Sequence, residues 1–115
     1  MNSSYPIKNG IVVVPLENHP IFDYSNRLWS TLNQLAEEPQ IKAIVINCEH
    51  RTKIDFMEAL TLNTIATKMK KLNKQLAICF QDHKCWNDFR LSQIRGIVAM
   101  YSSVDEALVQ VSNLV

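Results

Sequence analysis

Short apolar runs alternate with longer amphipathic stretches along the chain. Three runs are apolar and too short for a helix, which is typical of buried strands, and they cover residues 10–16, 41–47 and 75–80. Residues 97–101 predict a last strand of the same kind. Ahead of the first run, residues 5–8 predict an edge strand, joined to it by a hairpin turn at Asn9-Gly10.

Two long stretches have the period of amphipathic helices. One helix is predicted over residues 23–38, where Pro39 ends it, and another over residues 55–72. Asp55 and Glu58 can act as N-cap and reciprocal partner at the start of the second helix, in a variant of the capping box. The predicted apolar faces contain Leu28, Leu32, Leu35 and Ala36 in the first helix and Leu62, Ile65, Met69 and Leu72 in the second.

Two further helices are predicted nearer the C-terminus. The first covers residues 82–94, with Trp86, Phe89 and Ile94 as candidate inward residues. The second starts at an S-x-x-E capping box made by Ser103 and Glu106. Its helical period continues through Val104, Ala107, Leu108 and Val111.

The order of these elements predicts the fold class. Strands that alternate with helices imply a largely parallel sheet with right-handed crossovers. We therefore expect an α/β fold with a four- to five-stranded, mostly parallel sheet and about four helices, packed mainly on one side of it. A chain of 115 residues suits one domain, so residues 1–115 are expected to form a single unit.

Composition and charge narrow the class of protein. The formal net charge of +1 provides no global field for nucleic acid or an anionic membrane, and no apolar run reaches the roughly 20 residues needed to span a bilayer. The N-terminus does not have the pattern of a secretory signal, and three cysteines without the spacing of small secreted proteins suggest reduced thiols. These features favour a cytoplasmic protein.

Candidate chemistry is sparse. Cysteines and histidines lie near the C-terminal ends of two predicted strands, at Cys48, His50, Cys79, His83 and Cys85, but their spacing is not that of a zinc motif. Cys48 with His50, or Cys85 with His83, is a conceivable nucleophile pair that the sequence cannot orient. The chain lacks the G-x-S-x-G, glycine-rich phosphate-loop and H-E-x-x-H motifs. We expect no catalytic residues, no metal site and no cofactor.

Two other features have a structural and a functional interpretation. The lysines at positions 68, 70, 71 and 74 suit the C-terminal end of a helix, where cations complement the dipole, better than a patch for an acidic partner. Trp29 and Trp86 are large enough to anchor a partner, but core burial is the more common fate of such side chains.

The segments 41–60 and 97–111 together resemble a STAS domain, which anti-sigma factor antagonists share with the cytoplasmic ends of sulfate transporters. In that family a hydrophobic strand and a short loop precede an Ile-Asp pair and a hydroxyl residue at the start of a long helix. Ile54-Asp55 stands at this place here, residues 70–78 resemble the basic helix end and next strand, and residues 103–108 match the closing S-x-x-E-A-L segment. The resemblance covers about residues 10 to 112 and implies a STAS-like fold.

The chain departs from the family at the phosphorylated position. In the antagonists a kinase phosphorylates the Ser or Thr after the Asp, and the added charge changes partner binding. Phe56 stands there instead and has no hydroxyl, while Thr52 and Thr61 do not match the position. The resemblance therefore implies a non-enzymatic regulatory protein-interaction module without the usual phosphorylation switch.

The expected partner-binding surface is the loop over residues 48–53 with the start of the following helix, and it comprises Arg51, Thr52, Lys53, Asp55, Phe56, Met57 and Glu58. We expect a protein partner, such as a kinase-like anti-sigma factor or a transporter component, with contact to a membrane only through that partner, and a homodimer remains open. One alternative is a small-ligand or anion-binding domain using the helix starts near Asp55 and His83. Another is an accessory STAS subunit of a transporter.

Overall fold

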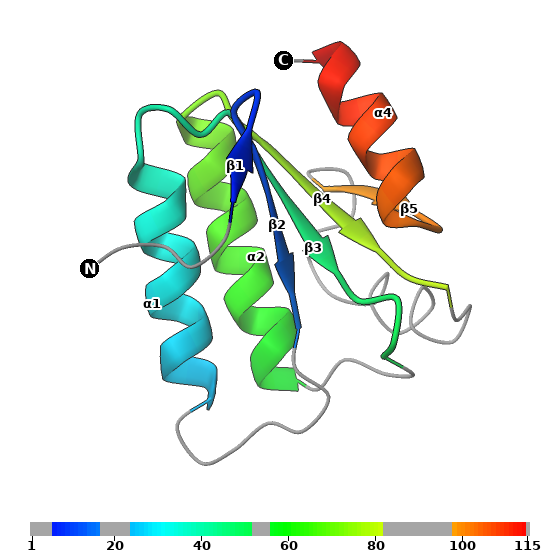
Figure 1. Ribbon diagram of the computed structural model, residues 1–115. Coiled ribbons are helices and arrows are strands. Elements are labelled where there is room, and N and C mark those ends of the chain that lie inside the picture. The colour runs from blue at the N-terminus through cyan, green and yellow to red at the C-terminus, as the bar shows by residue number, and fades with distance from the viewer. Residues whose placement is uncertain (1–5, 17–23, 52–55, 82–97, 115) are drawn as a thin grey trace.

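A computed structural model describes residues 6–16, 24–51, 56–81 and 98–114. These residues form a five-stranded sheet in the order β1-β2-β3-β4-β5, with β1 antiparallel to β2 and the other pairs parallel (Figure 1). The strands are β1 (Ile7–Lys8), β2 (Ile11–Pro15), β3 (Ala43–Asn47), β4 (Gln75–Cys79) and β5 (Ala99–Tyr101). The helices are α1 (Tyr24–Glu37), α2 (Phe56–Lys71) and α4 (Val104–Leu114). The predicted α/β class with a mostly parallel sheet is confirmed.

The hairpin turn predicted at Asn9-Gly10 joins β1 to β2. Both residues have a positive φ, 55° at Asn9 and 81° at Gly10, as in the mirror-image turns that suit the twist of a two-residue hairpin. Gly10 also lies against the chain before β3, where its carbonyl oxygen accepts hydrogen bonds from the backbone N–H groups of Lys42 and Ala43.

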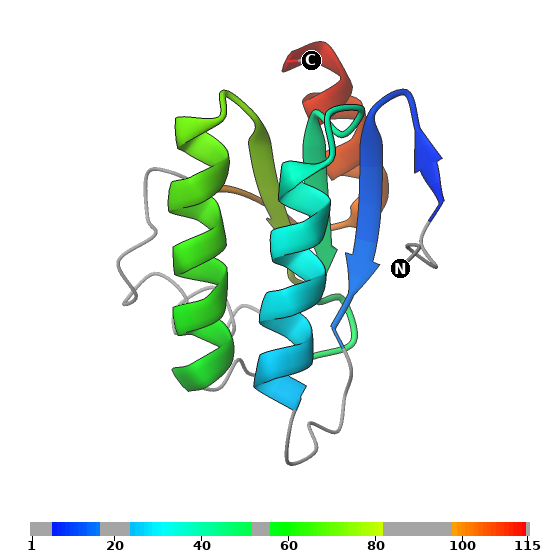
Figure 2. The same cartoon turned by 90° about the vertical axis from the view of Figure 1, so that its left-hand side faces the viewer.

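Alternate residues of the central strands face opposite layers, because side chains in a strand alternate between the two faces of the sheet. Pairing aligns Val13 with Val45 and Val45 with Ala77, so each row across the sheet belongs to one face. Helices α1 and α2 cover one face and α4 covers the other (Figures 1 and 2). The core under α1 and α2 includes Val12, Val14, Ile44, Ile46 and Ile78, and the core under α4 includes Ile11, Ala43, Val45, Ala77 and Cys79.

The helical period correctly predicted most of the apolar faces of α1 and α2. The predicted α1 residues are all buried, and so are Leu62, Ile65 and Met69 of α2. Leu72 is an exception, since 44% of it is exposed. It lies after the last residue of α2, in a turn completed by Asn73 with a φ of 60°, and so it is not held on the helix face.

The predicted capping box at the start of α4 is present in a modified form. The backbone N–H of Glu106 donates to Ser103 Oγ at 3.1 Å. The Glu106 carboxylate accepts hydrogen bonds from the backbone N–H and the hydroxyl of Ser102, at 3.1 and 3.0 Å, one residue earlier than the standard box. The helix predicted over residues 82–94 lies outside the described residues. Among those that are described, no helix is long and apolar enough to cross a membrane.

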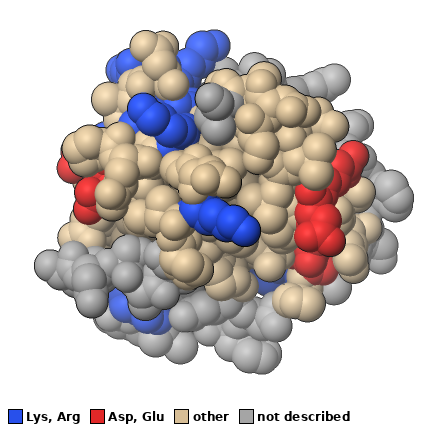
Figure 3. All heavy atoms as spheres, turned by 45° about the horizontal axis from the view of Figure 1, so that its top comes forward, with Lys and Arg blue, Asp and Glu red and all other residues tan. Residues whose placement is uncertain are grey.

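Two lysines, Lys68 in α2 and Lys74 just after it, form hydrogen bonds to α1 and its C-terminal end. Lys68 Nζ donates to Asn33 Oδ1 at 2.5 Å and to Glu37 Oε2 at 2.6 Å. Lys74 Nζ donates to the carbonyl oxygens of Ala36 and Glu38, at 2.6 and 2.9 Å, and thus places a cation at the C-terminus of α1. Figure 3, in which this end of the molecule comes forward, shows several basic side chains grouped at the upper left and another standing apart near the middle of the view.

Candidate partner-binding surface

The loop after β3 is held by short-range hydrogen bonds at the carboxyl edge of the sheet. The backbone N–H of Cys48 donates to the carbonyl oxygen of Cys79 at 2.9 Å, which continues the pairing of β3 with β4. Asn47 Oδ1 accepts from the backbone N–H of Glu49 at 3.0 Å, and the backbone N–H of Arg51 donates to the carbonyl of Cys48 at 3.0 Å. The path of residues 47–51 is therefore a compact turn with defined backbone partners.

The same loop is also tied to the start of α4. Glu49 Oε2 accepts a hydrogen bond of 2.7 Å from the backbone N–H of Val104, the first residue of that helix. A carboxylate at this place complements the positive end of the helix dipole. Segments far apart in the sequence are thus joined at one end of the sheet.

A buried ion pair connects the loop to α2. Arg51 Nη1 donates to Glu58 Oε2 at 2.7 Å and Nη2 donates to Oε1 at 2.6 Å, which is the bidentate geometry of an arginine–carboxylate pair. Arg51 is 8% exposed and Glu58 is fully buried. Glu58 lies one turn before Leu62 in α2, and residues four apart share one face of a helix, so the carboxylate of Glu58 is on the inward face.

This pair changes the interpretation of two expected surface residues. Glu58 offers no surface to a partner in this conformation, and Arg51 offers little. Glu58 bonds Arg51 through both carboxylate oxygens, and Asp55, its predicted partner in the capping box, lies outside the described residues. Arg51 and Glu58 therefore position the loop against α2.

Exposed apolar side chains follow on the outer face of α2. Met57 is 50% exposed and Leu60 is 46% exposed, and they stand three residues apart on the side of the helix that faces solvent. Thr52, Lys53 and Asp55 lie outside the described residues, and so does the side chain of Phe56, which opens α2. Leu60 was missed by the sequence analysis, although its position off the apolar face of the helix predicts exposure.

Trp29 of α1 is a third exposed apolar side chain, on the helix that packs beside α2. It is 43% exposed, so it is not the buried core residue that its size favours. Asn33, one turn after Trp29 on the same face of α1, bonds Lys68 of α2, so Trp29 lies on the side of α1 that faces α2. We define the apolar surface by its three described residues, Trp29, Met57 and Leu60.

The cysteine and histidine positions do not gather into a metal site within the described residues. Those residues include no group of three or more His, Cys, Asp or Glu placed to hold a metal ion. Cys48 and Cys79 are buried, and burial, followed by the charges of Glu49 and Glu106, raises the pKa of the Cys79 thiol to about 12. His50 is exposed, whereas His83, Cys85 and Trp86 lie outside the described residues.

The fold and the arrangement of this surface define a small α/β module with helices on both faces of a mixed sheet. The family model of the STAS domain matches residues 2–107, and the chain belongs to this family. The fold also matches a crystal structure from Thermotoga maritima, at a TM-score of 0.74 and 14% identity over 94% of this chain and 92% of that one. That protein is described as a candidate anti-sigma factor antagonist. No curated protein matches the sequence.

Proposed function

We propose that this STAS domain is a regulatory module that binds a protein partner through the apolar surface and the adjoining loop over residues 48–53. Membership in the family supports a role in regulated protein interaction, and STAS domains are in general not enzymes. The observation that carries the proposal is the exposure of Met57 and Leu60 beside a loop anchored by a buried ion pair. Exposed apolar groups on a well-held scaffold are typical of interaction sites.

The partner is expected to be a kinase-like anti-sigma factor or a transporter component, as the resemblance implies. Phosphorylation at the family position is not expected to control this interaction. Phe56 has no hydroxyl to accept a phosphoryl group, and the first hydroxyl residue within α2, Thr61, is only 6% exposed. Control by partner abundance or by a ligand replaces the phosphorylation switch in this proposal.

Two leucines of similar exposure allow a matched test. Leu60 is 46% exposed near the start of α2, and Leu72 is 44% exposed just beyond its other end. The tagged full chain is used to isolate partners from extracts of the source cell, and a partner identified by mass spectrometry is then purified. Isothermal titration calorimetry measures its affinity for the wild type, Leu60→Gln, Met57→Gln and Leu72→Gln.

The two surface variants should lose affinity while remaining folded. A residue that acts as a central anchor contributes about 2 kcal/mol or more, so Leu60→Gln should weaken binding about thirtyfold or more. Leu72→Gln should bind like the wild type. Equal affinities for all four proteins would refute this location of the surface, and equal losses in Leu60→Gln and Leu72→Gln would refute its restriction to the start of α2.

A further inference from the structure

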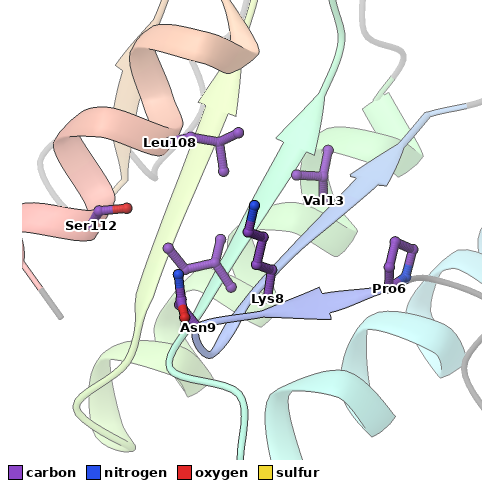
Figure 4. Close-up of a pocket in the computed structure, with 7 residues that line it drawn as sticks. Pro6, Lys8, Asn9, Val13, Leu108 and Ser112 are labelled. Carbon is purple, nitrogen blue, oxygen red and sulfur yellow. The ribbon is translucent and has the colours of Figure 1, made fainter.

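A groove lies on the opposite side of the sheet, between the β1–β2 hairpin and α4. It has a volume of about 430 Å³. It is lined by Pro6, Lys8 and Asn9 of the hairpin region, Ile11 and Val13 of β2, and Leu108 and Ser112 of α4. Figure 4 shows the side chains of Lys8 and Leu108 directed toward the space between the hairpin and the helix. The groove is remote from the apolar surface, because α1 and α2 cover the other face of the sheet.

The groove follows from the side-chain sizes on this face. Ala43 of β3, Ala77 of β4 and Ala107 of α4 are small and fully buried, so α4 packs closely over the middle of the sheet. The helix covers β2 only in part, since Ile11 is buried but Val13 is only half-buried. Part of the apolar surface of β2 is thereby left uncovered between the β1–β2 hairpin and α4.

The lining combines an apolar floor with one charge. Ile11, Val13 and Leu108 contribute branched aliphatic groups, and Lys8 is the only charged residue among the described residues of the lining. The other polar groups, the Asn9 amide and the Ser112 hydroxyl, can each donate a hydrogen bond. Pockets for small ligands are mostly apolar with a few placed polar groups, and their volumes are roughly 300–1,000 Å³.

We infer that this groove binds a small amphipathic carboxylate, such as a medium-chain fatty acid, with its hydrocarbon part on Ile11, Val13 and Leu108 and its carboxylate at Lys8. In the part of the lining that the structure describes there are a cation and two neutral donors but no acidic group, so it complements an anion and opposes a cation. The hydrocarbon chain is required because most of the lining is apolar and a fully polar anion would leave it unmatched.

The binding test is an NMR titration of the full chain, labelled with ¹⁵N, with decanoate below its micellar concentration. Saturable amide shifts should centre on the hairpin and on α4 around Leu108. Decanol and decylammonium have the same chain length with no charge and with the opposite charge. Decanoate should bind more tightly than decanol, and decylammonium should bind more weakly than either.

Two lysine variants test whether the charge of the groove, rather than surface charge in general, binds the carboxylate. Lys8→Gln should weaken decanoate binding about three- to fivefold, the range of an exposed ion pair, and leave decanol binding unchanged. Lys70→Gln removes an exposed lysine outside the lining and should change neither. Both replace exposed side chains, and thermal unfolding checks that they are folded.

Several outcomes would overturn the inference. They are the absence of saturable shifts at millimolar decanoate, shifts that centre away from the groove, equal weakening by both lysine variants, and decylammonium binding as tight as decanoate. Recruitment of the protein to neutral vesicles without binding of free decanoate would assign the groove to a lipid surface instead and would also overturn it. None of these results bears on the affinity series at Leu60, so the two proposals fail independently.

Discussion

Removal of one partner of the buried Arg51–Glu58 pair should cost a large part of the stability of the domain. The two bonds are 2.6 and 2.7 Å long, and neither side chain is more than 8% exposed. Breaking such a pair leaves a buried charge or donor group without its partner and costs about 3–5 kcal/mol. The whole free energy of unfolding expected for 115 residues is about 6–17 kcal/mol, from roughly 0.05–0.15 kcal/mol per residue.

The assay is urea unfolding of Glu58→Leu, Arg51→Met and the double variant Arg51→Met/Glu58→Leu. At a urea slope of roughly 1.5 kcal/mol per M, each single variant should unfold about 2–3 M earlier than the wild type. The double variant should recover most of this loss, because apolar side chains replace both buried charges. With a residual loss of about 1 kcal/mol in the double variant, the coupling energy in a double-mutant cycle should be about 5–9 kcal/mol in magnitude.

A second ion pair of the same length provides the control. Lys68 Nζ and Glu37 Oε2 are also 2.6 Å apart, but their side chains are 29% and 61% exposed. Solvent screening limits such pairs to under about 1 kcal/mol, so Glu37→Gln should move the midpoint little. Single losses below about 1 kcal/mol for Arg51 and Glu58, or additive effects in the double variant, would refute the argument that burial makes this pair strong.

Three smaller effects complete the expectations. Ser103→Ala should lower the free energy of unfolding by about 1 kcal/mol through loss of the cap on α4, and an unchanged urea midpoint and slope would contradict this. Gly10→Ala should cost about 1–2 kcal/mol, because φ is +81° there and a Cβ would come within 2.9 Å of Lys42 Cγ; a loss below about half a kcal/mol would show that the turn relaxes. Burial raises the pKa of Cys79 to about 12 from 9.0, so this group contributes stability below pH 9 that is lost as pH rises toward 12. In a Cys85→Ser variant, used to remove the third thiol, a thiol reagent at pH 8 should react with the remaining cysteines only on unfolding, and fast reaction of the folded protein would argue against their burial.

Local signals in the sequence were sufficient for most of the fold. The β-branched runs, the hairpin dipeptide at Asn9-Gly10 and the cap at Ser103 act over a few residues, so the strands, turn and helix start could be predicted without knowledge of the rest. Leu72 marks the limit of this reasoning. Its spacing fits the apolar face of α2, but the helix ends before it.

The candidate surface could be located by sequence only in outline. The loop and helix start were predicted from their order after the strand, and the outward position of Leu60 was available from helical period. The inward turn of Arg51 toward Glu58 could not be predicted in the same way. A loop joins the two residues, and hydrophobic periodicity does not determine the path of a loop. The same argument applies to Glu49, whose partner Val104 comes from the far end of the chain.

The sequence alone determined the elements that the structure describes, their order and the absence of a hydroxyl at Phe56, because these depend on residue identity and short-range geometry. Only the tertiary structure decided which polar groups are buried and where the sheet is left uncovered. Lys8 and Leu108 line one groove because α4 packs closely over small residues of β3 and β4 and leaves Val13 of β2 only half-buried. Such a juxtaposition depends on how whole elements pack, and it has no local signature in the chain.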